Sequence, residues 1–327
     1  MARKLVIQIP CLNEERTLPG TLAALPRTVP GVDVVEWMVV DDGSTDQTVQ
    51  VARAHGVDHV VRHPMRQGLA RAFATGLDAA LRLGADVIVN TDADNQYDAR
   101  SIPALVQPIV DGRADMVVGD RGTDAIAHFS WSKKRLQKLG SWVVRQASGT
   151  TVPDATSGFR ALSREAALKL NVVSDYTYTL ETLIQAGHRN ITTVSVPVGT
   201  GPMTRESRLI QSLPHYLRRS AATIVRMYSM YRPMRAFLLA GGTLLVAGFV
   251  LGARFLWFFV NGQGGGHVQS LLLAVILSVV GAQTVLTGLV ADLIGINRTL
   301  LEETLARVKR LELDAERDRE MDLTTRR

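Results

Sequence analysis

Short apolar runs rich in β-branched residues alternate with longer amphipathic stretches along the first 200 residues. The apolar runs predict strands at residues 4–10, 34–40, 58–63, 86–90 and 114–121. Apolar side chains recur at 69, 73, 77 and 81, which predicts a helix over residues 66–84. Strands that alternate with helices of this length favour an α/β fold, in which helices cover both faces of a mostly parallel sheet.

Polar residues near the strand ends suggest where the first helices begin. Asn13 is expected to cap the helix that follows the first strand. Ser44 or Thr45 is expected to cap the next helix, which extends over residues 46–56. Further along, Asp98 is expected to cap a helix that begins near Ser101.

The pattern changes after about residue 205. Apolar residues at 209, 213, 217, 221, 224, 228 and 231 form a helical stripe, and arginines lie mostly outside it. We expect residues 205–235 to form amphipathic helices at a membrane surface; helices docked on the globular part are the alternative. Residues 236–260 and 268–296 are long and apolar enough to cross a bilayer, despite Arg254. The alternative for them is a buried helical hairpin in a soluble protein.

The distribution of basic residues predicts an orientation. Seven arginines lie from Arg205 to Arg235 against one acid, Glu206, and the turn at 261–267 has no Lys or Arg. The positive-inside rule therefore predicts both termini in the cytoplasm and the turn outside. The expected organisation is a cytoplasmic domain over 1–204, juxtamembrane helices over 205–235, two transmembrane helices over 236–296 and a charged helical tail over 297–327. The tail is also a candidate for homo-oligomer contacts.

Composition narrows the function classes. The formal net charge of the 327-residue chain is +6, and the positive excess precedes the apolar segments. The basic segment shows no aromatic-plus-basic pattern of a nucleic-acid-binding module. Its positive charge therefore indicates binding to anionic lipid headgroups or to a phosphorylated substrate rather than to DNA. Cys11 is the only cysteine, which excludes an internal disulfide and suits a reducing compartment. The N-terminal stretch is too short to be a signal peptide.

Oxygen-bearing side chains collect where the predicted strands end. Asp92, Asp94 and Gln96 alternate after the fourth strand, so in extended backbone their side chains share one side. Two carboxylates on a short turn are a typical site for Mg²⁺ or Mn²⁺, which shares its other positions with phosphate oxygens. In parallel sheets ligands bind beyond the carboxyl ends of the strands, where Asp41 and Asp42 also lie.

The glycine motifs of other nucleotide sites are missing. The chain has neither G-x-G-x-x-G after the first strand nor G-x-x-x-x-G-K-[ST]. A nucleotide held through a metal and acidic side chains fits a nucleotide-sugar instead. Glu14 and Asp41 are the candidates to accept hydrogen bonds from its base and ribose.

Together, "IPCLNEE", "VVDDGSTD", "TDADNQ", "GDR" and "DATSGFRALSREA" resemble the family 2 inverting glycosyltransferases of the GT-A fold. Among these the chain is most similar to dolichol-phosphate mannose synthases and bacterial polyprenyl-phosphate glycosyltransferases, over about residues 1–230. The resemblance implies a GT-A (Rossmann-like) catalytic domain and a metal-dependent enzyme. Its donor would be GDP-mannose or a UDP-sugar, and its acceptor a polyprenyl or dolichyl phosphate.

The resemblance also implies a role for each site residue. The metal and diphosphate would be held by Asp92, Asp94 and Gln96. The nucleotide-sugar pocket would comprise Pro10, Leu12, Glu14, Asp41, Asp42, Asp92, Ala93 and Asp94. Asp94 and Arg121 would be catalytic, and the acceptor phosphate would be met by Arg121, Arg135, Ser207 and Arg208. The sequence departs from the family at Leu12, where tyrosine is usual, and at "RESR", which lacks a glycine; the first departure leaves the base open.

The acceptor can also be argued from chemistry. A sugar hydroxyl needs a general base, and residues 150–160 hold no Glu-Asp pair where such transferases keep one. A lipid phosphate is already anionic at neutral pH and needs arginines to position it. Its in-line attack on the anomeric carbon would invert the configuration. A processive polysaccharide synthase and an inactive membrane scaffold of the same fold remain the alternatives.

Overall fold

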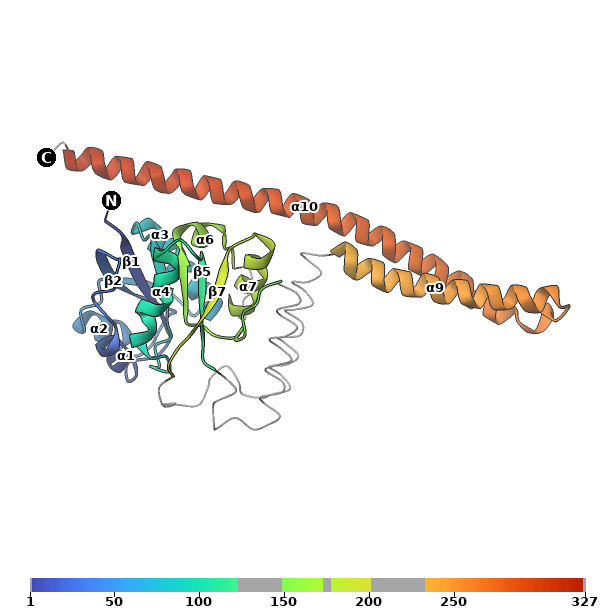
Figure 1. Cartoon of the computed structure of the whole chain (residues 1–327), viewed down its shortest axis with the longest axis horizontal. Coiled ribbons are helices and arrows are strands. Elements are labelled where there is room, and N and C mark those ends of the chain that lie inside the picture. Colours follow the sequence, from blue (N-terminus) through green and yellow to red (C-terminus); the bar gives the residue numbers. More distant parts are fainter. Residues whose placement is uncertain (1, 123–148, 173–177, 201–232, 326–327) are drawn as a thin grey trace. The chain divides into compact units, whose positions relative to one another are not determined.

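The computed structural model describes residues 2–122, 149–172, 178–200 and 233–325 (Figure 1). Its first part is built on a sheet with the strand order β3-β2-β1-β4-β6-β5-β7. The strands are β1 (Lys4–Cys11), β2 (Val34–Asp41), β3 (His59–Arg62), β4 (Val87–Asn90), β5 (Met116–Asp120), β6 (Arg160–Ser163) and β7 (Thr193–Pro197). All neighbours pair in parallel except β6, which is antiparallel to β4 and β5. The predicted mostly parallel α/β sheet is confirmed.

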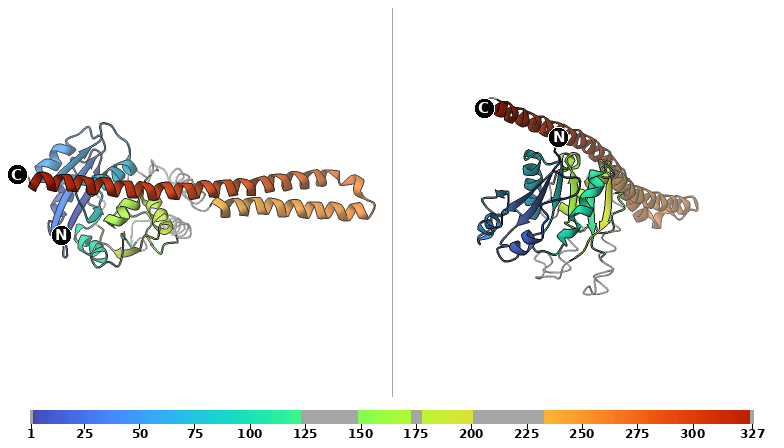
Figure 2. Two further views of the ribbon diagram at one scale, coloured as in Figure 1. Left: turned by 90° about the horizontal axis from the view of Figure 1, so that it is seen from above. Right: turned by 60° about the vertical axis from the view of Figure 1, so that its left-hand side comes forward.

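Helices cover both faces of the sheet (Figures 1 and 2). One face carries α1 (Leu18–Ala24), α2 (Thr48–Ala54), η1 (Ala99–Ser101) and α4 (Ile102–Val110). The other carries α3 (Leu69–Arg82), α6 (Arg164–Lys169) and α7 (Tyr178–His188). The predicted helix at 66–84 is α3, whose Phe73, Leu77 and Leu81 are buried.

Strand β1 lies in the middle of this core. Leu5, Ile7 and Ile9 are fully buried and belong to the apolar cluster that includes α1 and α4. Burying each such side chain contributes about 1.5–3 kcal/mol. On the opposite face Gln8 lies against α3, where a β-carbon at Gly76 would come within 2.4 Å of Gln8 Oε1. Glycine at 76 therefore lets α3 approach the strand.

Two of the expected helix caps were wrong. Helix α1 begins at Leu18 after Thr17, and Asn13 instead adopts a left-handed conformation with φ of 55°. Its side chain accepts a hydrogen bond from Thr45 N (2.8 Å), and its own N–H donates to Ser44 Oγ (2.9 Å). These groups join the loops after β1 and β2, so they are not available as caps. Asp98 does act as a cap, but of the short helix η1, where its carboxylate accepts from Arg100 N; the N-cap residue of α4 is Ser101.

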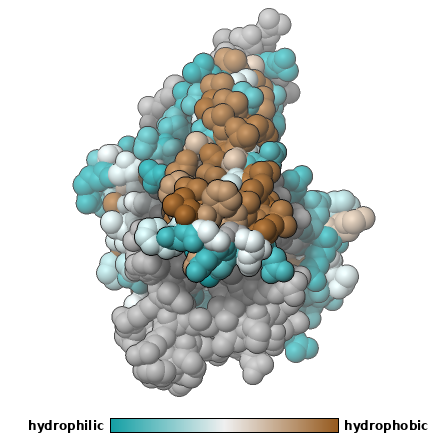
Figure 3. Space-filling view, turned by 90° about the vertical axis from the view of Figure 1, so that its right-hand side faces the viewer, coloured by the Kyte–Doolittle hydropathy of each residue, from teal (hydrophilic) through white to brown (hydrophobic). Residues whose placement is uncertain are grey.

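A second compact unit, residues 225–304, contains α9 (Pro233–Val260), η2 (Gly264–Gly266) and the apolar part of α10 (Val268–Thr325). The two helices pack antiparallel and closely, because a β-carbon at Gly241 would lie 2.7 Å from Gly281 O. Their outer faces expose large apolar side chains, among them Phe249 (78%) and Trp257 (72%). Figure 3 shows hydrophobic surface in brown on one face of the molecule. Both helices are long and apolar enough to cross a membrane.

Helix α10 continues without a break from the apolar segment through the charged tail to Thr325. The tail is therefore helical as far as Thr325. Residues 305–327 group with the first compact unit, residues 1–224. The predicted boundaries at 204, 235 and 296 stay predictions, and most of the expected juxtamembrane segment lies outside the described residues.

Candidate functional site

The carboxyl ends of β1, β2 and β4 bring the predicted donor-site residues to one edge of the sheet. Cys11 pairs with Asp41 across β1 and β2, and Asp42 N donates to Cys11 O at 2.9 Å. The loop after β4 joins the same edge, because Thr21 Oγ1 of α1 donates to Ala93 O (2.9 Å). We call this region the donor edge: residues 10–14, 41–42 and 92–96.

The first part of the donor edge is a buried, acidic wall. Asp41 is fully buried; its Oδ1 accepts from Ser44 N at 3.1 Å. Its Oδ2 forms an ion pair with Nε of the exposed Arg62 at 3.1 Å, but it accepts no hydrogen bond from the described residues. Glu14 is also buried, and its Oε2 accepts from Thr17 Oγ1 at 2.5 Å. A buried carboxylate oxygen without a hydrogen-bond donor is costly; the charge of Arg62 offsets part of this cost, and a donor from a ligand would offset more.

Two apolar residues complete this wall. Pro10 is buried within β1, and Leu12 is half-buried directly after the strand. An aliphatic side chain at 12 can cover one face of a base by contact, but it cannot stack as an aromatic ring does. Their roles in nucleotide binding stay predictions.

Asp42 is engaged by a neighbouring loop. Its carboxylate accepts from Gln67 N and Gly68 N, both at 2.8 Å, and lies 2.8 Å from His63 Nδ1. Gly43 permits this approach, since a β-carbon there would come within 2.7 Å of Arg66 N. In this structure Asp42 therefore stabilises the loop after β3. Its predicted contact with the nucleotide stays a prediction.

The acidic segment after β4 is a turn rather than extended backbone. Asn95 has a φ of 56°, and Gln96 N donates to Asp94 Oδ1 at 3.2 Å. The expectation that Asp92, Asp94 and Gln96 share one side through strand alternation was therefore wrong. Asparagine tolerates the left-handed conformation, so the chain can curl here. The side chains of Asp92, Asp94 and Gln96 are all half-buried.

A divalent metal fits this donor set. Among the described residues, no group of three or more His, Cys, Asp or Glu side chains is arranged to hold a metal alone. Asp92, Asp94 and Gln96 would thus supply only part of a coordination shell. Mg²⁺ and similar hard ions bind in this way, through one or two carboxylates and substrate phosphates.

Arg121 follows β5 and forms a buried ion pair. Its Nε and Nη2 donate to the two carboxylate oxygens of Asp154 (2.6 and 3.0 Å), and Nη2 also donates to Thr156 Oγ1 (2.8 Å). Burial alone would raise the pKa of Asp154, but the hydrogen bonds and charge of Arg121 hold that pKa below its ordinary value. The guanidinium is thus fixed in orientation, and the charge of Asp92 also acts on it.

Comparison with known proteins identifies the family. The model of glycosyl transferase family 2 matches residues 6–170, which include both strand-end acidic motifs, Arg121 and Asp154. The chain belongs to glycosyl transferase family 2. It is a glycosyltransferase, as the sequence predicted.

Its relatives include proteins named for lipid-linked sugar synthesis. A polyprenol monophosphomannose synthase of Mycolicibacterium smegmatis is 30% identical over 60% of this chain and 76% of the relative. A UDP-N-acetylglucosamine–dolichyl-phosphate N-acetylglucosaminyltransferase of Methanococcus voltae is 30% identical over 61% and 87%. An uncharacterised glycosyltransferase of Mycobacterium tuberculosis is 36% identical over 61% and 85%.

Solved structures confirm the GT-A fold. Glucosyl-3-phosphoglycerate synthase from Mycobacterium tuberculosis, in complex with Mn²⁺, UDP-glucose and glycerol 3-phosphate, aligns with a TM-score of 0.53. The identity is 26%, and the alignment covers 69% of this chain and 80% of that chain.

Some predicted residues of the glycosyltransferase lie outside the described residues. These are Arg135, Ser207 and Arg208, all assigned to the acceptor phosphate. Of that group only Arg121 is described. Their roles stay predictions.

The sequence reading missed a polar layer beneath the acidic turn. Gln8 Nε2 donates to Asn90 Oδ1 (2.9 Å), and Asn90 Nδ2 donates to Gly158 O (2.8 Å) and Tyr178 Oη (2.9 Å). All of these side chains are buried. The sequence did contain a signal: β1 and β4 each carry one side-chain amide, Gln8 and Asn90, among apolar residues. A buried amide of this kind needs a hydrogen-bond partner, so the two could have been expected to pair.

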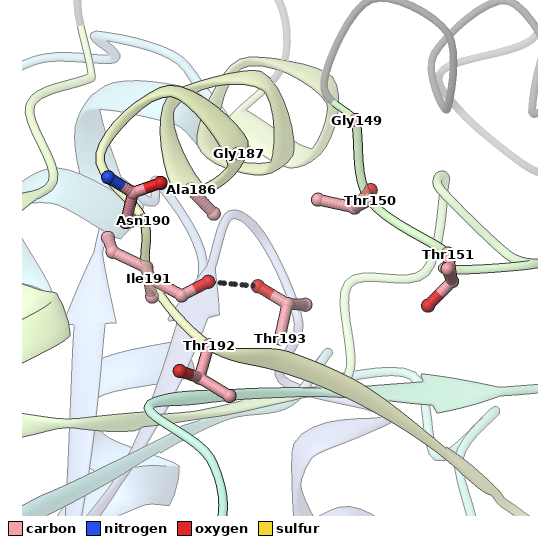
Figure 4. A pocket seen from close by; sticks show the side chains of 9 residues that line it. All are labelled: Gly149, Thr150, Thr151, Ala186, Gly187, Asn190, Ile191, Thr192 and Thr193. Carbon is pink, nitrogen blue, oxygen red and sulfur yellow. Dashed lines mark hydrogen bonds between the residues drawn. The ribbon is translucent and has the colours of Figure 1, made fainter.

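A pocket of the glycosyltransferase lies outside the donor edge (Figure 4). Its volume is about 310 Å³, and residues 149–151, 186–187 and 190–193 line it. Thr193 is the first residue of β7, so the pocket is at the amino end of that strand, away from the donor edge. The bond drawn in Figure 4 joins Thr193 Oγ1 to Ile191 O at 3.0 Å.

Proposed function

We propose that this glycosyltransferase transfers a single sugar from a nucleotide-diphosphate sugar to a polyprenyl or dolichyl phosphate, giving a lipid-linked sugar. The observation that carries the proposal is the acidic turn of Asp92 and Asp94, together with an arginine that Asp154 fixes in place and on which the charge of Asp92 acts. This pairs a site for a metal-bound diphosphate with a site for a second phosphate. The names of two relatives, which join a sugar to a polyprenol or dolichyl phosphate, support the same substrates.

The donor would bind along the donor edge. Asp41 Oδ2, which accepts no hydrogen bond from the described residues, would accept one from the base, and Glu14 would face the ribose. Mg²⁺ or Mn²⁺, held by Asp92, Asp94 and Gln96, would neutralise the charge that develops on the leaving diphosphate. A solved structure of similar fold in complex with Mn²⁺ and UDP-glucose supports this part.

The acceptor would be an anionic nucleophile that needs no base. One oxygen of the lipid phosphate attacks the anomeric carbon, the bond from that carbon to the diphosphate breaks, and the nucleoside diphosphate leaves with inversion. Among the described residues Arg121 donates through Nε and Nη2 to Asp154 and Thr156, and Nη1 would contact the phosphate. Arg135, Ser207 and Arg208 would complete the phosphate site.

The apolar helices would place the reaction at a membrane. Helices α9 and α10 can cross a bilayer, and a lipid phosphate is presented at its surface. The arginine-rich segment before α9 favours the cytoplasmic face.

A transfer assay tests the proposal. Purified full-length protein is mixed with Mg²⁺ or Mn²⁺, a radiolabelled nucleotide-sugar and a polyprenyl phosphate. GDP-mannose, UDP-glucose and UDP-N-acetylglucosamine are tested in turn. We expect one donor to give a lipid product that carries a single sugar.

Two controls make the assay specific. The matching polyprenol, which lacks the phosphate, should accept no sugar, because its hydroxyl would need a base. Product length on a gel separates single transfer from a processive polysaccharide synthase. If no donor yields a lipid-linked product, the proposed function is wrong.

A further inference from the structure

Arg160, the first residue of β6, is the largest fully buried side chain among the described residues. Burial of a charge is expensive unless hydrogen bonds replace water. Its Nε donates to Ser157 O (2.8 Å) and its Nη2 to Ala155 O (3.1 Å). Its Nη1 donates to Thr182 Oγ1 of α7 at 2.5 Å. The guanidinium therefore binds three oxygens, two of them carbonyls of one short backbone segment.

That segment, residues 154–158, lies between the two halves of the candidate site. At its start Asp154 fixes Arg121, and at its end Gly158 lies beside Asp92. A β-carbon at 158 would be 3.4 Å from both carboxylate oxygens of Asp92 and 2.7 Å from Tyr178 Oη. Glycine is needed at 158 for space, and the backbone itself forms the surface behind Asp92.

Gly158 is also held from the side of β4. Its carbonyl accepts from Asn90 Nδ2 (2.8 Å), and its N–H donates to Tyr97 Oη (3.0 Å). Burial, and then the charge of Asp92, raises the pKa of Tyr97 to about 12, so the phenol stays neutral at physiological pH. The segment is thus fixed on one side by Asn90 and Tyr97 and on the other by Arg160.

The charge of Arg160 persists despite its burial. Burial lowers the pKa of its guanidinium to about 10, while Tyr178 and Tyr97 act in the opposite direction. It is therefore a cation at neutral pH. An apolar side chain of similar size would fill the same volume without the desolvation cost of a charge, which is several kcal/mol. A role in stability alone does not explain this residue.

We propose that Arg160 is a positioning residue of the donor site. It holds the backbone of residues 155–158 against Asp92 and thereby fixes that carboxylate for a metal-bound diphosphate. This inference rests on the proposed function, because it assumes that Asp92 serves such a donor. It assigns to the arginine of "SGFR" a part in metal and nucleotide affinity, without contact to either.

Lysine and methionine substitutions separate the effect of the positive charge of Arg160 from the effect of its planar set of hydrogen-bond donors. Arg160→Lys keeps the charge, but a single ammonium group cannot reproduce the planar fork that bridges three acceptors. Arg160→Met keeps much of the volume and removes the charge. Both should loosen the segment, whereas a purely electrostatic role would spare Arg160→Lys.

The opposite end of the same strand offers a matched control. Arg164 also donates to backbone carbonyls, Leu81 O and Ala85 O, both at 3.4 Å. It follows β6, at the end of that strand remote from the donor edge. Arg164→Lys therefore tests the general effect of changing an arginine that binds carbonyl groups.

The experiment measures Mn²⁺ binding by electron paramagnetic resonance, with saturating UDP or GDP, on full-length protein in detergent. Arg160→Lys and Arg160→Met should weaken Mn²⁺ affinity roughly 10–100-fold, the usual effect of losing an outer-shell partner. Arg164→Lys should bind Mn²⁺ as the wild type does. Equal affinity in the wild type and a folded Arg160→Lys would overturn the inference.

A second pair of variants decides the matter if Arg160→Lys does not fold. Thr182→Val removes one acceptor of Arg160 at constant volume, and Thr182→Ser keeps the hydroxyl. We expect weaker Mn²⁺ binding and a lower thermal midpoint in Thr182→Val, because a buried N–H of Arg160 loses its acceptor, and recovery of both in Thr182→Ser. Unchanged affinity in Thr182→Val would overturn the inference. Absence of Mn²⁺–nucleotide binding in the wild type itself would instead show that the proposed donor site is wrong.

Discussion

At the scale of single residues, Asp94 combines a turn-forming role with a proposed metal-binding role. Its Oδ1 accepts from Gln96 N, a bond that an asparagine side chain can also accept. Asp94→Asn should therefore keep the turn but remove the charge. We expect transfer activity to fall on the order of 1000-fold or more, since a metal ion contributes several kcal/mol to transition-state stabilisation.

The radiolabel assay measures this loss, and a thermal unfolding scan checks that the protein stays folded. Asp98→Asn is the matched control, because Asp98 lies in the same loop but pairs with Arg100. It should retain activity. Full activity in Asp94→Asn would remove this residue from the metal site.

Asp154 should make the free energy of unfolding depend on pH. Its pKa is lowered in the folded protein; burial acts against this, but the hydrogen bonds of Arg121 prevail. The stabilisation is thus present above the unfolded pKa of about 4 and is lost as pH falls through the folded pKa. Asp154→Asn should cost about 3 kcal/mol at pH 7, because it leaves a largely buried arginine without its partner.

Thermal midpoints from pH 6 to pH 3 measure the effect. The difference between wild type and Asp154→Asn should shrink as the solution becomes more acidic. Asp111, whose carboxylate pairs with Arg113 at the surface, provides the comparison. Asp111→Asn should change the midpoint far less, since exposed ion pairs contribute little. A constant difference for Asp154→Asn across this range would contradict the argument.

At the scale of elements, periodicity was enough to predict β1 to β5 and α3, because each shows its pattern within a single run of residues. It did not reveal β6. That strand has four residues, begins with Arg160 and is a strand only because β4 and β5 pair with it on either side. Non-local pairing of this kind leaves little trace in local sequence.

The same limit applies to the site. Residue type and position at strand ends predicted Asp41, Asp92 and Asp94 as neighbours along one edge. The conformation at Asn95 and the partners of Asp42 depended on contacts between loops, which the local pattern does not contain. The sequence therefore predicted the location of the site better than the arrangement of its side chains.

The hairpin of α9 and α10 depends on small residues at its interface. A β-carbon at Gly248 would lie 2.5 Å from Ser278 Oγ and 2.9 Å from Ala274 O. At Gly242, on the same helix, nothing lies within 4 Å. Gly248→Leu should therefore separate the helices and destabilise the unit by about 1–3 kcal/mol, the usual cost of overpacking.

Thermal unfolding of the full-length protein in detergent measures this cost. Gly242→Leu is the control, and it should behave as the wild type does. Equal midpoints for the two variants would show that close helix contact does not stabilise the hairpin.

At the scale of the whole molecule, the proposed topology can be tested with single cysteines. Cys11 is replaced by serine, and one cysteine is then introduced at Gln263 in the turn or at Ala315 in the tail; both positions are exposed. A membrane-impermeant maleimide should label Gln263→Cys in intact cells. Ala315→Cys should react only after the membrane is permeabilised. The reverse pattern would contradict a cytoplasmic tail.

The native thiol has a further consequence for the unmodified protein. Cys11 is 2% exposed, and its Sγ donates to Ile9 O at 3.4 Å. Burial, and then the charges of Glu14 and Asp41, raise its pKa well above the ordinary value. Because thiol reagents attack the thiolate, modification must await a transient opening of the donor edge. The rate of Cys11 modification thus reports how often that edge opens, and slower modification with a nucleotide present would reveal binding without any assay of turnover.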